Sequence, residues 1–412
     1  CRGQWPDNAV SLFSVAQAFR MAGMPKCAAQ VCERLISECP DNPEAHALLY
    51  VVLRETGDDA AARRAAEAAY AVFPDVPEIV FNLSQAYLTG RKADDAERVL
   101  KAALEKAPES EDLCGGLAAV MLHKGKPDEC LKVLQAAPPA AEPSPRITAL
   151  EALALLLSGD ATGAADKAAA CEDGPLGVVA HLIATAACLK NDKPEAAAAA
   201  LLQPDGKTPY GGRAGIVLLH ALGRSEPELA DPNDVALAQV LAGDPGLRCD
   251  FALAAACQMS DFHDDALAAL VRIESKAAEG SLSLLPLIYA SLAKSTRTPE
   301  PAAKAREVAE RHAAAPGAWL GLANVMRGFD DPDGQLEALN RAAEVGPQEP
   351  AVLLQRGMFY ESGKQYDAAI AEYVDGFVYP VLEQALVALT AGRTPDYEQL
   401  ARQALASKNR SI

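Results

Sequence analysis

The 412-residue sequence has few aromatic side chains, although half of its residues are hydrophobic. Phe, Trp and Tyr together account for 5% of the chain. Stretches that alternate Val, Ile, Thr and Tyr with polar residues are absent, which argues against β-sheets. Alanine instead recurs along the whole chain; it has the highest helix propensity and lets helices approach closely. The composition therefore predicts an all-α protein.

The sequence also lacks a long apolar run and a basic cluster. Its most apolar run, residues 152–157, is far shorter than the ~18 residues that a membrane-spanning helix needs. The net charge is -18, and no group of Lys and Arg is present that would displace counterions from nucleic acid. We therefore expect no nucleic-acid partner and no membrane-spanning segment.

Motifs that carry catalysis are missing as well. The sequence contains no nucleophile elbow, phosphate-binding loop, dinucleotide fingerprint or zinc-protease motif. Its ten cysteines show neither a C-x-x-C pair nor zinc-finger spacing. We predict a protein that is not an enzyme, with no cofactor and no metal.

Two short clusters resemble sites but are better explained by turns. Residues 261–265 hold three Asp and one His where a turn between two helices is expected, and Asp commonly caps a helix there. A metal site would need ligands from several elements. Residues 209–213 form a Gly-containing connection. An enzymatic site in residues 204–250 is thus the least supported function.

A period of 34 residues organises the chain. Pro40, Pro74 and Pro108 are 34 residues apart, and so are Pro316 and Pro350. Within each unit, two apolar stripes at helical spacing predict a pair of helices. In the first unit the stripes are Leu12, Val15, Ala16 and Phe19, followed by Ala28, Cys32 and Leu35. A glycine separates the two stripes in each of the first four units, and we expect it to end the first helix in a left-handed conformation. These glycines are Gly23, Gly57, Gly90 and Gly125.

This pattern resembles the tetratricopeptide repeat (TPR) family, which has small or large apolar residues at these positions and proline near the end of each unit. The resemblance returns near the C-terminus with Trp319, Gly357 and Tyr360, and departs from the family at Gln335 and Arg356. It implies a right-handed α-solenoid of helix-turn-helix repeats with roughly eleven hairpins.

The predicted organisation follows the quality of the match. In chain order we expect an N-terminal tail (1–8), four regular TPR units (9–137), a Pro-rich linker (138–145), a divergent helical-repeat region (146–315), two regular TPR units (316–379) and a capping hairpin (380–412).

The resemblance also implies that other proteins bind in a concave groove lined by the first helix of each unit. Four apolar groove residues are not needed by the core of the repeat, and exposed apolar groups there favour an extended partner segment. Two alternatives stay open: single surface hydrophobics are normal, and the tail with Trp5 and Pro6 could fold back into the groove. The candidate groove residues are Phe13, Gln17, Arg20, Val51, Arg54, Phe81, Gln85, Leu88 and Leu122.

The sequence as given starts with Cys1, and Cys-Arg-Gly-Gln-Trp-Pro resembles the start of a mature bacterial lipoprotein, in which the first cysteine is acylated. We therefore expect a lipid anchor in the bacterial cell envelope, on its periplasmic or outer surface. Most other cysteines stand where a repeat takes a small apolar residue and indicate a reducing setting, which favours a cytoplasmic alternative. One disulfide among Cys27, Cys32 and Cys39 stays open.

These expectations define two functions. The first is a non-enzymatic scaffold or assembly subunit of a larger envelope-associated complex, which binds partner proteins through the groove. The alternative is a soluble cytoplasmic TPR adaptor, or a regulatory sensor of a peptide or small ligand.

Overall fold

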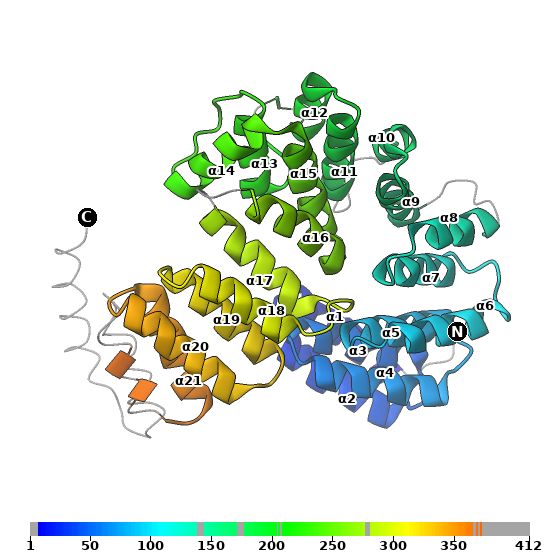
Figure 1. The fold of residues 1–412 in the computed structure, drawn as a ribbon. Coiled ribbons are helices and arrows are strands. Elements are labelled where there is room, and N and C mark those ends of the chain that lie inside the picture. The colour runs from blue at the N-terminus through cyan, green and yellow to red at the C-terminus, as the bar shows by residue number, and fades with distance from the viewer. Residues whose placement is uncertain are drawn as a thin grey trace. The chain divides into compact units, whose positions relative to one another are not determined.

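The computed structural model describes residues 7–137, 144–170, 177–203, 205–206, 208–276, 281–365, 368–369 and 371–372. The N-terminal helices are α1 (Asp7–Met21), α2 (Pro25–Glu38), α3 (Pro43–Glu55), α4 (Asp59–Val72), α5 (Pro77–Thr89), α6 (Ala93–Leu104), α7 (Glu111–His123) and α8 (Pro127–Ala136) (Figure 1). The central helices are α9 (Pro145–Ser158), α10 (Ala161–Ala169), α11 (Gly177–Lys190), α12 (Pro194–Leu201), α13 (Gly212–Ala221), α14 (Pro232–Gly243), α15 (Pro245–Met259) and α16 (His263–Glu274). The last are the 3-10 helix η1 (Ser281–Leu284), α17 (Leu285–Lys294), α18 (Pro301–Arg311), α19 (Pro316–Gly328), α20 (Pro332–Val345) and α21 (Pro350–Ser362).

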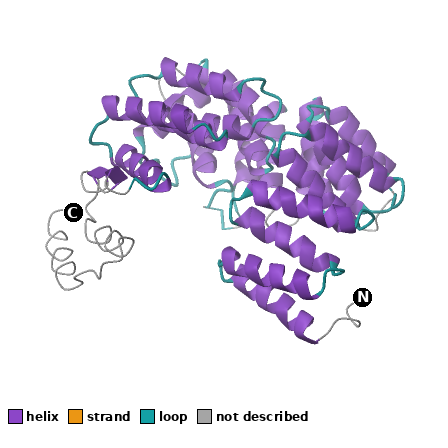
Figure 2. Ribbon diagram, turned by 90° about the horizontal axis from the view of Figure 1, so that it is seen from below, coloured by secondary structure: helices purple, strands orange, loops and turns teal. Residues whose placement is uncertain are grey.

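The predicted all-α class is confirmed. The 21 α-helices of the described residues pack in consecutive pairs, as a TPR-like repeat array does (Figure 2). Outside the helices, the extended backbone pairing in the described part of the chain is a single isolated bridge between Leu202 and Pro209. The handedness of the array and the six predicted segments stay predictions.

Contacts between residues divide the helices into two compact units. Unit 1 consists of Cys1–Leu229 with Leu241–Ala269, and unit 2 of Ala230–Val240 with Leu270–Ile412. Each unit is described by itself.

The helices begin where proline and short polar side chains favour a start. Pro43 opens α3, and the carboxamide oxygen of Asn42 accepts a hydrogen bond from the amide of Ala45 at 3.1 Å. The carboxylate of Asp58 accepts one from the amide of Ala61 at 2.8 Å and caps α4. Proline lacks the amide that the first turn cannot use, and the caps satisfy amides that would otherwise lack partners.

Alanine allows the two helices of a repeat to cross closely. Ala16 of α1 and Ala28 of α2 are fully buried in one cluster with Cys32 and Val52. Cys32 behaves there as a small hydrophobe, and burial raises the pKa of its thiol to about 11.

The cysteines of α2 and its C-cap form no disulfide. Cys27, Cys32 and Cys39 are all free thiols. The disulfide that the sequence left open among them is therefore absent.

The turn between the two helices of a repeat requires a left-handed residue. Gly23, Gly57 and Gly125 occupy it with φ between 70° and 78°. The prediction for the third repeat was wrong in detail: Gly90 caps α5 at φ -80°, and Arg91 takes the left-handed position at φ 59°. The third repeat thus keeps the left-handed turn, but the left-handed residue is Arg91, one position later than the glycine that we expected.

We expect Gly57→Ala to lower the stability of unit 1. A Cβ at this position would meet no atom within 4 Å, so its cost comes from the backbone at φ +78° and amounts to about 1 kcal/mol. Gly317→Ala is the matched control, since a Cβ there also meets open space and φ is not positive. The measurement is the urea midpoint of each variant by circular dichroism. Equal midpoints for the two variants would show that the turn carries no left-handed constraint.

Several predicted features lie outside the described residues. They are Cys1, the tail residues Trp5 and Pro6, linker residues 138–143 and the capping hairpin 380–412. Among the helices that the structure describes, none combines the length and the apolar character needed to cross a membrane.

Candidate functional site

The first helices of the N-terminal repeats share one surface of unit 1. Helices α3, α5, α7 and α9 contact one another in chain order, and α4, α6 and α8 pack against them as the second helices of their pairs. We call the exposed surface of α1, α3, α5, α7 and α9 the first-helix face. It is where the TPR resemblance places a partner.

The nine predicted groove residues differ in their solvent exposure. Gln17, Arg20 and Arg54 are exposed. Phe13, Val51, Phe81 and Gln85 are half-buried. Leu88 and Leu122 are only 5% and 1% exposed, so the expectation that they present apolar surface to a partner is wrong.

The turn that precedes α16 covers the ends of α5 and α7. The ring of Phe262 lies 4.9 Å from the ring of His123, the residue directly after Leu122. Asp264 interacts electrostatically with Arg91, which follows the end of α5. A segment of this same chain therefore occupies the C-terminal ends of these two helices, and the sequence spacing of the repeats could not predict it.

The two predicted aromatic residues are engaged within the fold. Phe13 packs against the cluster of Ala16 and Cys32 and also against Leu35. The guanidinium of Arg146 lies 4.4 Å above the centre of the Phe81 ring. Both rings stabilise unit 1, and Phe81 does so through a cation–π contact.

Arg146 reaches Phe81 because α9 is held close to α7. The amide of Ser144 donates a hydrogen bond to the Glu111 carboxylate at 2.9 Å, and bonds from Ser144 lower the pKa of Glu111. A Cβ at Gly115 would come within 2.9 Å of Ile147. The absence of a side chain at Gly115 thus lets the start of α9 cross α7.

Three carboxylates line the start of the first helices. Glu44, Glu78 and Asp112 hold the second position of α3, α5 and α7, and we call them the acidic row. The pKa of Glu78 is raised, first because neighbouring atoms remove water from its carboxylate and then because Glu44 and Asp112 repel its charge. The sequence shows an acid at the same position of three units, and the packing of α3, α5 and α7 brings the three carboxylates close enough for their charges to interact.

Amide side chains without partners continue the same stripe of α5. Asn82 and Gln85 lie one and two turns beyond Glu78. The carboxamide nitrogens of Asn82 and Gln85, and one carboxylate oxygen of Glu44, are buried without a hydrogen-bond partner. Asn82 is only 6% exposed. Buried polar atoms are normally paired with protein groups or ordered water, so a bound partner that supplies hydrogen bonds would stabilise these three atoms.

We expect Glu78→Gln to stabilise the free protein at about pH 7.5 by a small amount, on the order of 1 °C in Tm. A raised folded-state pKa means that the protonated form is favoured on folding. The resulting stability is complete below the pKa of the unfolded chain and is lost as the pH rises through the folded pKa. Glutamine mimics the protonated form, so the gain should shrink as the pH falls toward about 4. Thermal unfolding of both proteins across this range measures it, with exposed Glu105→Gln as control. A lower Tm for Glu78→Gln at neutral pH would mean that its carboxylate has a stabilising partner.

Residues 261–265 and residues 209–213, which we interpreted from the sequence as connections between helices, each contain a turn packed into the fold. Asp261 and Phe262 form the turn before α16, and the buried His263 contacts the Asp261 carboxylate at 3.4 Å. No group of three or more His, Cys, Asp or Glu within the described residues is arranged to hold a metal ion. Tyr210 is buried and stacks on His181 with ring centres 3.8 Å apart, so residues 209–213 are packed into unit 1.

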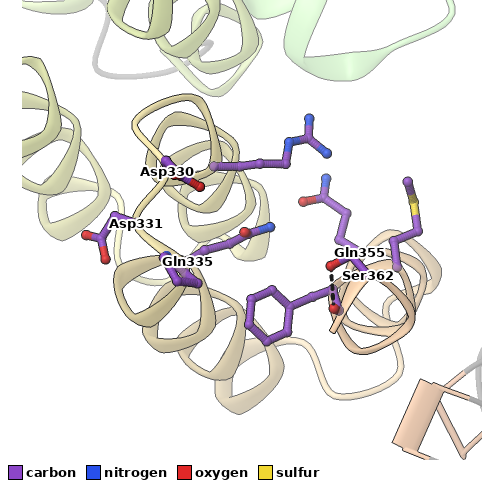
Figure 3. A pocket seen from close by; sticks show the side chains of 9 residues that line it. Asp330, Asp331, Gln335, Gln355 and Ser362 are labelled. Carbon is purple, nitrogen blue, oxygen red and sulfur yellow. Dashed lines mark hydrogen bonds between the residues drawn. The ribbon is translucent and has the colours of Figure 1, made fainter. Parts of the chain in front are cut away.

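Unit 2 contains a cavity of about 370 Å³ that sequence reasoning missed. Figure 3 shows Asp330, Asp331 and Gln335 on one side of it and Gln355 and Ser362 of α21 on the other. Two of these groups make local bonds: Asp331 caps α20 by accepting from the amide of Gly334 at 2.9 Å, and the Ser362 hydroxyl donates to the carbonyl of Phe359 at 2.7 Å. Arg327 and Met358 complete the lining from α19 and α21. The cavity offers polar and charged groups of both signs to a small ligand.

Comparison with protein families supports the repeat assignment for part of the chain. The tetratricopeptide repeat family model matches residues 88–154, from the end of α5 into α9. Residues 88–154 thus match the tetratricopeptide repeat, and proteins with such repeats bind other proteins. A search of curated proteins finds no match.

Solved TPR structures resemble parts of the chain at low identity. A thermophilic TPR protein of Thermus thermophilus is 22% identical over 42% of this chain and 98% of its own, with a TM-score of 0.38. The PilF protein of Pseudomonas aeruginosa is 16% identical over 47% and 88%, with a TM-score of 0.40. A TPR protein from Parabacteroides merdae is 12% identical over 70% and 100%, also with a TM-score of 0.40. These scores say nothing about what this chain binds.

Proposed function

We propose that this protein is a non-enzymatic scaffold that binds a partner protein on its first-helix face. The observation that carries the proposal is the set of unpaired buried polar atoms on α3 and α5, at Glu44, Asn82 and Gln85. Leaving such atoms without hydrogen bonds costs stability in the free protein, and a partner that supplies the missing groups offsets this cost. The face is reachable around Gln17 and Arg54, because both side chains are exposed.

The binding face is confined to part of the row of first helices. The turn at Phe262 covers the C-terminal ends of α5 and α7, where Leu122 is buried. The partner therefore binds along α1, α3 and the parts of α5 and α7 that precede their C-terminal ends. This is a smaller surface than the repeat pattern alone implied.

Photo-cross-linking tests the scaffold function. A photoreactive amino acid in place of Gln17 on α1 should form one reproducible adduct with a partner in an extract of the source cells. The same amino acid in place of the exposed Ala68 on α4 is the control, since it lies on a second helix. Adducts from both positions, or from neither, would contradict specific binding at the first-helix face.

The place of the scaffold in the cell is a proposal based on the sequence alone. We place it in the bacterial cell envelope as a subunit of a larger complex, anchored by acyl chains on Cys1. A single acyl chain gives only marginal membrane affinity, so two or three chains are expected. Mass spectrometry of the N-terminal peptide from the source organism should show a diacyl or triacyl addition on Cys1. An unmodified peptide, or one that extends N-terminally beyond Cys1, would remove the anchor and favour the cytoplasmic adaptor.

The cavity of unit 2 favours a second candidate function, a sensor of a small ligand. Arg327, Asp330 and Gln355 line it, so a ligand with both charged and hydrogen-bonding groups would suit it. The first-helix face carries the stronger proposal, because its buried polar atoms lack partners.

A further inference from the structure

We infer that the partner segment bound by the first-helix face is basic, with an arginine side chain held between Glu44 and Glu78. This inference rests on the proposed function and specifies the chemistry of the partner. It starts from two carboxylates on adjacent helices that form no ion pair within the described part of the chain. Their charges face each other closely enough for Glu44 to raise the pKa of Glu78.

A purely structural role does not explain this arrangement. An acid in the first turn of a helix interacts favourably with the helix dipole, and Glu44 and Glu78 both gain from it. That effect acts within one helix and does not require carboxylates of neighbouring helices to approach each other. Their mutual repulsion is a cost that a bound cation removes.

The buried amides supply a second and independent indication of a ligand. Asn82 lies on the α5 stripe that starts at Glu78, is 6% exposed, and has a carboxamide nitrogen without a partner. The carboxamide nitrogen of Gln85, one turn later on α5, is also buried without a hydrogen-bond partner. Carboxamide donors spaced by one helical turn fit the carbonyl groups of an extended peptide once both side chains turn outward, because their nitrogens are buried in the free protein. The main chain of the segment then binds α5 while its cation binds the acids.

The chain shows which cation this region accepts. The guanidinium of Arg146 lies over the Phe81 ring and interacts with Asp112, the third member of the acidic row. At one end of the acidic row, Asp112 thus interacts with an arginine of the same chain. Glu44 and Glu78, at the other end, have no such arginine among the described residues. Guanidinium fits such a place because it pairs with carboxylates in bidentate fashion and stacks on aromatic faces.

A defined peptide tests the inference. The probe is a fluorescein-labelled peptide of about twelve alternating arginine and alanine residues, and the matched peptide carries glutamate in place of arginine. Fluorescence anisotropy should show binding of the arginine peptide and none of the glutamate peptide. The double variant Glu44→Gln/Glu78→Gln should bind the arginine peptide about tenfold more weakly or worse, because charge-assisted hydrogen bonds are lost.

Two further variants separate site-specific binding from general charge attraction. Glu67→Gln/Glu105→Gln removes the same charge from two exposed positions, one in α4 and one at the C-cap of α6, and should leave affinity within about twofold. Asn82→Leu should weaken binding about tenfold while leaving Tm unchanged or higher, because it removes an unpaired buried amide. Equal losses in both double variants, or a loss in neither, would overturn the inference. So would a fall in Tm for Asn82→Leu with unchanged affinity.

The cross-linking experiment distinguishes failure of the basic-segment inference from failure of the scaffold function. If the adduct from position 17 forms and persists in Glu44→Gln/Glu78→Gln, a partner binds this face but not through the acidic row, and the inference alone fails. If no adduct forms from position 17 in the unmodified chain, the scaffold function itself fails.

Discussion

The close crossing of paired helices at alanine is the constraint on which the rest of this structure depends. Ala16 and Ala28 are fully buried where α1 meets α2, and Ala96 is equally buried in α6. A larger side chain at such a crossing would force the helices apart, since interiors have no free volume to absorb it. The short distance within each pair lets Gly57 and its equivalents close the turn, and it sets the spacing at which successive first helices meet.

That spacing brings the acids of neighbouring repeats together. Glu44, Glu78 and Asp112 occupy the same position in three successive repeats. The packing of α3, α5 and α7 therefore aligns their charges, although the three residues are far apart in sequence. On α5, the carboxamide nitrogens of Asn82 and Gln85 are buried without a hydrogen-bond partner. The unpaired groups of unit 1 lower its stability in the free protein, and we assign them to partner binding. Functional sites commonly carry such a loss of stability.

The sequence predicted the helices well because each repeat is a local pattern. Stripes at helical spacing, proline at helix starts and a left-handed turn residue all act within one unit. The pattern failed at Arg91, which takes the left-handed position expected of Gly90, and at Val15, which belongs to the first apolar stripe but is exposed. The site was predicted less well because it depends on distant contacts. The contact of His123 with Phe262 joins residues far apart along the chain, and the pairing of Arg146 with Phe81 depends on how α9 crosses α7. No period in the sequence encodes these contacts.

The central claim is that the charge of Glu78 is destabilised in the free protein and stabilised by a basic partner segment. Its most direct test is the pKa of the Glu78 side chain by carbon-13 NMR, assigned with Glu78→Gln and measured with and without the arginine peptide. We expect a pKa above the ordinary glutamate value in the free protein, with a fall on binding of the peptide. An ordinary or lowered pKa in the free protein, or one that the peptide does not change, would show that Glu78 does not bind a basic segment in this way.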